Sequence, residues 1–474
     1  MKRHYTLSGL LLCLMTLFTL NASAIRGGDK APDKDYLCFT ANEDNSTVEL
    51  TKVASGTIIT AVIEYSTDGT SWTAVDFSAN TTTGTITLSN AGDKVYFRNA
   101  KPASEDNYFS MDSNNYFKFI MTGSIAASGN IMSLVDLNCQ TTTIPYQCTF
   151  YKLFYNCTKL TSAPELPATT LATSCYYYMF YQCGLTSAPE LPATTLASQC
   201  YYHMFDYCTY LTTAPELPAT TLATSCYNYM FKNCSSLNDM KVAFSKFPSS
   251  SMTSSWVTSV ASAGTFSCPE GLTGTGANKI PTDWTVKNTY DLAITSETGW
   301  ASMCVNLPLI VPTGVDVYYA SAASGSTIEL TQIEAGTVMA AKTAVIVKGA
   351  KGTVGFPIAS EDGTSYPGNL FQGSSVDKAC NAGENYVLNA SKSSDDNVHF
   401  SIYTGTTLTN HKAWLPMSAV GGASSIQFRF ADATAISTME TEVAEDVIYN
   451  LAGQRVGSDY RGIVIKNGKK NYNK

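Results

Sequence analysis

The decapeptide APELPATTLA occurs three times without a change, at residues 163–172, 188–197 and 214–223. Each copy leads into a nine-residue segment with a cysteine at both ends: CYYYMFYQC, CYYHMFDYC and CYNYMFKNC. The copies begin 25 and 26 residues apart. A fixed period of this length is typical of proteins built from stacked repeats, because a single unit cannot bury its apolar face alone.

Each unit is predicted to contain an extended stretch. In the second full unit, Leu185, Ala188 and Leu191 recur every third residue, and Pro192 then ends a short strand or extended segment. A divergent earlier copy, CTFYKLFYNC at residues 148–157, has one residue more between its cysteines. The repeats therefore begin before the first decapeptide.

The cysteine-flanked segment is predicted to be a short helix. Its apolar residues follow the spacing i, i+1, i+4, i+5 and i+8, which places them on one buried helical face. A hydroxyl residue two places before the first cysteine of each copy would cap that helix. The buried face of the first copy comprises Cys175, Tyr176, Met179, Phe180 and Cys183, and the capping residues are Thr173, Ser198 and Thr224.

The repeat cysteines are predicted to be buried free thiols. Equivalent cysteines of neighbouring units would lie about 5 Å apart, but their side chains would point the same way, which a disulfide does not allow. Metal ligation is the alternative. However, the chain has no Cys-x-x-Cys pair, and a spacing of eight residues is not a known ligand pattern. We therefore expect no metal and no cofactor.

The segment Met179-Phe180-Tyr181-Gln182-Cys183-Gly184-Leu185 and its counterparts resemble the aromatic-Phe-x-x-Cys-x-x-Leu motif of BspA-like leucine-rich repeat surface proteins of gut and oral bacteria. The resemblance covers residues 137–237. It implies a short leucine-rich-repeat solenoid with a strand and a short helix in each turn. It also implies a surface protein that adheres to host extracellular proteins.

The N-terminus has the pattern of a secretory signal peptide. Lys2 and Arg3 precede an apolar run, and an Ala-x-Ala sequence ends at Ala24, where we expect cleavage. No later segment has about 20 uninterrupted apolar residues, so we expect no transmembrane segment. The sequence thus predicts an exported protein, at the cell surface or in the extracellular space.

The rest of the chain is rich in strand-like runs separated by Gly and Ser turns. The predicted fold is multidomain and mainly β. Its predicted parts are a signal peptide at 1–24, an N-terminal β-sandwich-like domain at 25–136, the solenoid at 137–237, a cap at 238–287, a C-terminal all-β domain at 288–435, and a tail at 436–474. The N-terminal domain could also cover the first turn of the solenoid.

Two segments carry further predictions about the C-terminal half. Trp256 and Trp284 are bulky enough to cover the last turn of the repeats. The tail contains the turn signal Asn467-Gly468 between two strand-like runs, which predicts a hairpin. It resembles the C-terminal sorting modules of type IX secretion cargo. The alternative is a last hairpin that packs on the preceding β domain.

Composition excludes some functions. Charged residues make up only 14% of the chain and the formal net charge is −8, so the sequence lacks the basic patch of a nucleic-acid-binding protein. No zinc-protease, nucleophile-elbow, phosphate-loop or dinucleotide motif occurs, and we predict that the protein is not an enzyme. His399 and His411 lie in ordinary β-domain contexts, and His203 replaces a tyrosine as an exposed variant.

Two sets of outward residues are candidates for binding. Tyrosines in register would form columns of the kind enriched in recognition surfaces, although their rings could instead pack on each other between turns. A glutamate recurs once per repeat and could attract a cation or a basic partner, although we favour a solvated ladder. These candidates are Tyr177, Tyr178, Tyr181, Tyr202, His203, Tyr207 and Tyr229, and the glutamates Glu165, Glu190 and Glu216.

The leading functional hypothesis is a non-enzymatic protein that binds an extracellular protein or glycan, in adhesion to host or neighbouring cells. The alternative is a structural spacer or assembly element of the cell envelope. A glycan-degrading enzyme is the third hypothesis, because its paired carboxylates would converge only in space.

Overall fold

The computed structural model describes residues 36–54, 61–77, 80–100, 109, 112, 114–390 and 398–431, and the backbone of four strands between 448 and 473. The fold is mainly β, and the helical elements in these residues are short 3-10 turns such as Ile131–Leu134 and Met417–Ala419. None of the described helices is long and apolar enough to cross a membrane. The predicted signal peptide lies outside the described residues.

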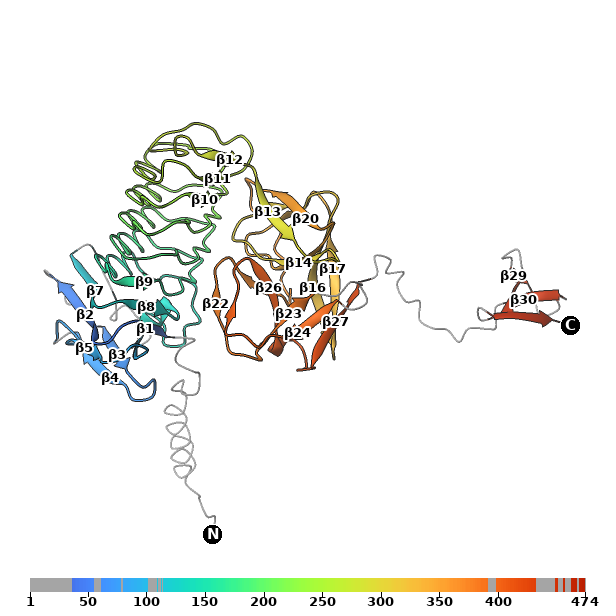
Figure 1. Ribbon diagram of the computed structural model, residues 1–474, viewed down its shortest axis with the longest axis horizontal. Coiled ribbons are helices and arrows are strands. Elements are labelled where there is room, and N and C mark those ends of the chain that lie inside the picture. The colour runs from blue at the N-terminus through green and yellow to red at the C-terminus, as the bar shows by residue number, and fades with distance from the viewer. Residues whose placement is uncertain are drawn as a thin grey trace, which may run out of the picture. The chain divides into compact units, whose positions relative to one another are not determined.

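The chain divides into two compact units, Met1–Arg429 and Phe430–Lys474. Within the first unit, the N-terminal β domain has two sheets, ordered β4-β3-β6-β1-β8-β9 and β5-β2-β7 (Figure 1). Rings from both sheets share one core, in which Phe119 lies 4.8 Å from Phe39 and 5.1 Å from Phe97. The strands are β1 Leu37–Ala41, β2 Ser46–Ala54, β3 Val62–Ser66, β4 Thr73–Asp76, β5 Ile86–Leu88, β6 Lys94–Asn99, β7 Asn115–Thr122, β8 Ile125–Ser128 and β9 Leu160–Ser162.

The N-terminal β domain runs directly into the repeats. Strand β9 belongs to the first repeat, and it pairs in parallel with β8, with Leu160 opposite Ile125. The backbone N–H of Ile131 also donates to the carbonyl of Glu165 at 3.1 Å. The first turn of the repeats therefore has its backbone edge covered by the N-terminal domain.

Residues 142–287 form a stack of turns, hereafter the stack, in which equivalent backbone positions of successive repeats bond to each other (Figure 1). The N–H of Phe150 donates to Cys175 at 2.8 Å, that of Tyr176 to Cys200 at 3.0 Å, and that of Tyr201 to Cys226 at 3.2 Å. Each turn thus satisfies the backbone of the turn before it.

The predicted helices are wrong, because the cysteine-flanked segments are ribbons of consecutive tight turns. Alternate N–H groups bond within the turn, as Tyr177 does to Ser174 at 3.3 Å, and the others bond to the next repeat, as Tyr178 does to Tyr202 at 2.9 Å. Every fourth residue has a positive φ, as at Ser174, Tyr178 and Gln182 (56°, 56° and 57°), whereas a helix keeps φ near −60° throughout. Thr173, Ser198 and Thr224 therefore cap no helix.

The predicted buried face is nevertheless confirmed. Every member of the set in the first copy is at most 3% exposed. Its rings form ladders through the stack: Tyr176 lies 5.8 Å from Tyr201, and Phe180 lies 5.6 Å from Phe205, with interplanar angles of 2° and 9°. The pattern i, i+1, i+4, i+5, i+8 fits a period of four as well as a helix, which explains why burial was predicted correctly and conformation was not.

The repeat cysteines are free thiols, as predicted. Each second cysteine donates its S–H to a phenylalanine carbonyl of the turn before: Cys183 to Phe154 at 3.0 Å, Cys208 to Phe180 at 3.1 Å and Cys234 to Phe205 at 3.0 Å. This donor satisfies a buried carbonyl, so the thiol fills space and completes a hydrogen bond.

One corner of the stack requires a glycine. The unit that begins at Leu160 is one residue shorter than the next, and Gly184 lies at the shortened corner. A Cβ at this position would come within 2.4 Å of the carbonyl oxygen of Thr158. The missing side chain therefore lets the two backbones approach.

Residues 238–287, predicted as a cap, continue the stack although their sequence no longer repeats. Strands β10 Asp239–Lys241, β11 Thr265–Ser267 and β12 Thr285–Lys287 form a parallel sheet. Trp256 is fully buried 6.2 Å from Tyr227 and donates to the carbonyl of Lys279 at 2.8 Å. Trp284 donates to the carbonyl of Ala261 at 2.8 Å. Trp256 therefore packs on the last repeat, as predicted, whereas Trp284 packs on the turn that follows it.

The C-terminal β domain, within residues 288–431, contains a nearly closed, barrel-like sheet ordered β14-β19-β16-β17-β27-β24-β23-β26-β21 (Figure 1). Val345 and Val347 of β19 face one core and Ile346 faces another, as strand alternation requires. Shorter pairs are β13 with β20, β15 with β18 and β22 with β25. The strands are β13 Thr289–Ile294, β14 Trp300–Met303, β15 Leu309–Ile310, β16 Asp316–Ser324, β17 Thr327–Ile333, β18 Val338–Met339, β19 Val345–Lys348, β20 Gly352–Pro357, β21 Gln372–Ser374, β22 Lys378–Ala379, β23 Asn385–Asn389, β24 His399–Ile402, β25 Thr407–Leu408, β26 Lys412–Pro416 and β27 Ser425–Phe430.

The second unit contains an antiparallel sheet ordered β29-β28-β30-β31. Lys466 stands opposite Lys469, which confirms the predicted hairpin between the last two strands. The strands are β28 Ile448–Asn450, β29 Arg455–Val456, β30 Gly462–Lys466 and β31 Lys469–Asn473.

Replacing Phe180 by alanine is expected to lower the free energy of unfolding by about 3–5 kcal/mol, because the ring is fully buried between Phe154 and Phe205. The exposed Tyr210→Ala change should alter it by less than about 0.5 kcal/mol. Equilibrium denaturation of both variants measures the difference. A loss below about 1 kcal/mol for Phe180→Ala would contradict a continuous ring ladder.

The buried repeat cysteines are expected to resist thiol reagents until the protein unfolds. Burial raises the pKa of Cys208 to about 12 and raises that of Cys183 well above its ordinary value, and only the thiolate reacts. The half-buried Cys148 should react first. Labelling at mildly alkaline pH with and without denaturant, followed by peptide mass mapping, tests this. Rapid modification of Cys208 in the folded protein would count against it.

Candidate functional site

The two sets of predicted binding residues lie on different parts of each turn. Glu165, Glu190 and Glu216, hereafter the glutamate column, stand between the first proline and the leucine of each Ala-Pro-Glu-Leu-Pro segment. The tyrosines come from the cysteine-flanked ribbons and form the second set, hereafter the tyrosine face. The tyrosine face is defined by Tyr151, Tyr155, Tyr177, Tyr178, Tyr181, Tyr202, His203, Tyr207 and Tyr229.

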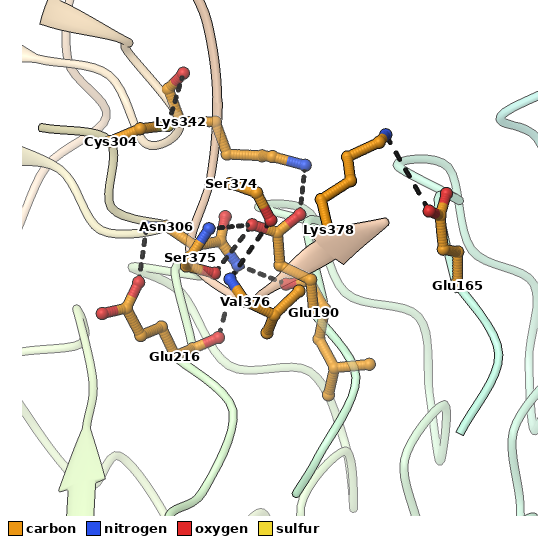
Figure 2. Close-up of polar contacts among 11 residues, drawn as sticks. Glu165, Glu190, Glu216, Cys304, Asn306, Lys342, Ser374, Ser375, Val376 and Lys378 are labelled. Atoms are coloured by element: carbon orange, nitrogen blue, oxygen red, sulfur yellow. Dashed lines mark hydrogen bonds and ion pairs between the residues drawn. The ribbon is translucent and has the colours of Figure 1, made fainter. Parts of the chain in front are cut away.

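The expectation of a solvated glutamate ladder is wrong for two of its three members. Glu216 is only 6% exposed, and Glu190 accepts bonds from the C-terminal β domain of the same chain (Figure 2). Only Glu165 remains exposed, with an oxygen 3.9 Å from the Lys378 ammonium. The glutamate column is therefore the surface on which the chain's own β domain docks.

Each buried glutamate has its own partners (Figure 2). Glu190 accepts the backbone N–H of Ser375 at 2.8 Å and its hydroxyl at 2.7 Å, and its other oxygen pairs with the Lys342 ammonium at 2.5 Å. Glu216 accepts the N–H of Asn306 at 2.5 Å, and its other oxygen lies 3.1 Å from His411 Nε2. Both carboxylates are thus bonded through both oxygens, which offsets the cost of burying them.

The protonation of Glu190 reflects this balance. Desolvation opposes its ionisation, but the charge of Lys342 and the hydrogen bonds from Lys342 and Ser375 outweigh it. The pKa of Glu190 therefore lies below its ordinary value. The carboxylate stays charged at neutral pH and holds the ion pair.

Asn306 of the C-terminal β domain bonds to two turns of the stack and so fixes the position of the domain along it. Its side chain is fully buried and its amide donates to the carbonyls of Leu191 and Glu216, at 2.9 and 3.4 Å. Two successive turns of the stack are therefore held by one residue of the C-terminal domain. Within the described residues, its own side-chain oxygen has no hydrogen-bond partner.

The tyrosine face is a set of rings stacked from turn to turn. Tyr177 lies 4.5 Å from Tyr202 at 9°, and His203 lies 4.3 Å from both Tyr178 and Tyr229, at 14° and 7°. The packing between turns considered above is therefore present. Burial, and after it the neighbouring Tyr202 and Asp206, raise the pKa of Tyr178 to about 12, so its hydroxyl is neutral at physiological pH.

Stacking leaves part of the face accessible. Tyr177, Tyr178 and Tyr202 are half-buried, whereas Tyr207 is 44% exposed and the adjoining Tyr210 is 66% exposed. Rings held against each other lose little freedom on binding and present a rigid contact surface. The sequence interpretation did not include Tyr210.

His203 is not the exposed variant that the sequence predicted. Its ring is sandwiched between two tyrosines, and its side chain is 12% exposed. Nδ1 lies 2.6 Å from Asp206 Oδ2, and Asp206 also accepts from the Asn233 amide at 3.3 Å. The imidazole is thus held in place by one buried carboxylate.

The divergent first copy adds residues to the tyrosine face that the sequence interpretation missed. Backbone bonds make Thr149, not Cys148, the equivalent of Cys175, so Lys152 takes the position of Tyr178. The Lys152 ammonium lies 5.1–5.7 Å from four tyrosine rings. The extra residue of the first copy lies near its first cysteine. Aligning the copies on their second cysteines, Cys157 and Cys183, would therefore have placed Lys152 opposite Tyr178.

The face continues onto the N-terminal domain. Tyr116 of β7 lies 5.2 Å from Tyr151, and Lys118 and Ile120 follow Tyr116 at alternate positions of the same strand. Side chains at alternate positions of a strand point to the same side. These three residues therefore extend the tyrosine face beyond the stack.

Within the described part of the chain, no group of three or more His, Cys, Asp and Glu side chains is arranged to hold a metal ion. His399 contacts Ser401 of its own strand at 3.2 Å. His411, predicted as an ordinary β-domain residue, instead contacts Glu216.

The chain matches no protein-family model, no curated protein and no solved structure.

Replacing Lys342 by methionine is expected to lower the free energy of unfolding by about 2 kcal/mol at neutral pH, because it leaves a largely buried carboxylate without its cation. The matched control is Lys351→Met, which removes an exposed pair with Glu297 and should cost less than about 0.5 kcal/mol. Thermal and chemical denaturation compare the two.

The same comparison has a defined pH dependence. A carboxylate with a lowered pKa stabilises the fold above its unfolded pKa, and this contribution is lost as the pH falls through its folded pKa. The gap between the wild type and Lys342→Met should therefore close in acid. A gap that stays constant down to the lowest pH at which the protein remains folded would contradict the ion pair.

Proposed function

We propose that this chain is an exported, non-enzymatic leucine-rich repeat protein that binds an extracellular protein or glycan through its tyrosine face. The biological role proposed is adhesion to host or neighbouring cells. One observation carries the proposal: the glutamate column is occupied by the chain's own C-terminal domain, whereas Tyr207 and the adjoining Tyr210 are exposed beside stacked rings.

The leucine-rich-repeat assignment is supported by the leucines that recur once per turn. Leu160, Leu185, Leu211 and Leu237 are all fully buried, at equivalent places in successive turns. A solenoid of this kind presents a flat side made of many short, equivalent segments. A flat side suits a broad partner surface better than an enclosed small molecule.

The absence of a catalytic role is part of the proposal. The pair of His203 and Asp206 is the acid–base pair on the tyrosine face within the described residues, and rings close on both sides of the imidazole. A general base needs to reach a proton on a bound substrate. The sandwiched ring favours a structural part for this pair.

A structural role in the cell envelope is the second candidate function. It is favoured by the way in which Asn306 and Lys342 lock the C-terminal domain onto the stack. Such a lock makes the first unit a rigid spacer. This hypothesis predicts no partner for the tyrosine face.

The test is binding of the full-length mature protein to arrayed extracellular matrix proteins and glycans. The triple variant Tyr177→Ala, Tyr178→Ala, Tyr202→Ala is expected to weaken binding at least about tenfold, because tyrosines at the centre of an interface are typical hot spots. Tyr207→Ala with Tyr210→Ala serves as a second variant, since these exposed rings can be removed with little effect on folding.

The matched control removes a ring pair elsewhere, Tyr319 with Tyr366, which lie 4.7 Å apart in the C-terminal β domain. The control should bind as the wild type does. Binding that survives both tyrosine-face variants would move the site to the β domains. An array without any bound partner would favour the structural spacer.

A further inference from the structure

Within the described residues, three lysines on the tyrosine face have no carboxylate partner: Lys118, Lys152 and Lys232. Lys152 lies among four tyrosine rings, and Lys232 lies 5.4 Å from the Tyr229 ring. Desolvation lowers the pKa of Lys152, and the charge of Lys118 lowers it further, so these two cations repel each other. Among the described residues, no carboxylate lies within ion-pair distance of any of the three.

Several of the described cations elsewhere in the first unit are paired. Acidic partners lie beside lysines and arginines of the N-terminal domain, the stack and the C-terminal domain alike. Such pairs are Arg98 with Glu64, Lys241 with Asp239, Lys287 with Asp291, Lys342 with Glu190, Lys351 with Glu297, and Arg429 with Glu329. In a chain with a formal net charge of −8, three cations left unpaired on one face are a local excess of positive charge.

The acidic groups on or beside the face are already engaged by their own neighbours. Asp206 is 2% exposed and bonds to His203 and to the Asn233 amide. Asp112 accepts the backbone N–H groups of residues 114 and 115. Glu49, on the strand beside β7, accepts hydroxyls from three threonines. None of these carboxylates lies within ion-pair distance of the three lysines.

We propose that the tyrosine face binds an acidic surface of a partner protein, with Lys118, Lys152 and Lys232 as the groups that pair with its carboxylates. This inference rests on the proposed function and adds the partner's chemistry to it. The lysines attract and orient the partner, and the rings supply the contact area.

A protein is favoured over an anionic glycan by the composition of the face. Positions next to the stacked tyrosines are filled by exposed amides such as Asn156 and Gln182, which donate and accept hydrogen bonds. Tyrosine with small polar groups is the composition of antibody binding loops, which recognise protein surfaces. The exposed Ile120 and Tyr210 at its borders add apolar contact area that a hydrated polyanion would not use.

The experiment measures binding of the full-length mature protein to an acidic polypeptide probe, a random copolymer of glutamate and tyrosine. Heparin serves as the anionic glycan probe and poly-lysine as the control of opposite charge. Lys118→Gln, Lys152→Gln, Lys232→Gln is the test variant. The control variant, Lys246→Gln, Lys279→Gln, Lys412→Gln, removes the same charge from exposed lysines off the face.

The expected result is that the copolymer binds and that the test variant weakens it about tenfold, as three exposed ion pairs would. The control variant should bind as the wild type does. Raising the salt from about 0.1 M to 1 M should remove the difference, because the screening length falls from about 10 Å to 3 Å. Lys118→Gln with Lys232→Gln repeats the test without disturbing the rings around Lys152.

Other outcomes overturn the inference. If heparin binds with the same lysine dependence and the copolymer does not, the partner is an anionic glycan. If neither probe binds, or if the control variant weakens binding equally, the lysines form no site for an acidic partner. A matrix protein that depends on the tyrosines but not on the lysines would leave the proposed function standing and remove only this inference.

Discussion

The bonds between backbones of successive turns are the constraint on which the rest of the first unit depends. Alternate N–H groups of each ribbon reach the next turn, as from Tyr178 to Tyr202, only because every fourth residue adopts a positive φ. For residues other than glycine this conformation is unfavourable by roughly 1 kcal/mol. The inter-turn bonds and the ring ladders offset that cost. They also set the spacing at which rings, thiols and glutamates repeat.

Much of the fold was accessible from the sequence, because repetition and burial leave a direct mark on residue type. The verbatim repeats predicted the stack. The apolar pairs Cys175-Tyr176 and Met179-Phe180, four residues apart, predicted its core. The ribbon was not accessible, since a buried pair every four residues fits a helix equally well. Its positive-φ positions are occupied by residues such as Tyr178 and His203 and not by glycine, so residue type does not predict the positive φ there.

Only part of the candidate site could be predicted from the sequence. Register alone predicted the columns of tyrosines and glutamates, because equivalent positions of a repeat must align. The partners of the glutamates could not be inferred, since Ser375 lies 185 residues after Glu190 and His411 lies 195 residues after Glu216. Neither belongs to a repeat or a motif, and their proximity exists only after the C-terminal domain has folded back.

Because the chain folds back, contacts with the C-terminal domain restrict where a repeat can be added to the stack. The domain follows β12, the last strand of the stack, yet it binds Glu190 and Glu216, which belong to earlier turns. These contacts are the grip of the domain on the stack. An extra turn inserted before Glu190 would lengthen the stack and leave this grip intact. An extra turn between Glu216 and β12 would displace both glutamates by about 5 Å from Asn306 and Lys342. Duplication of the nearly identical repeats is therefore compatible with the fold on one side of the grip and incompatible on the other.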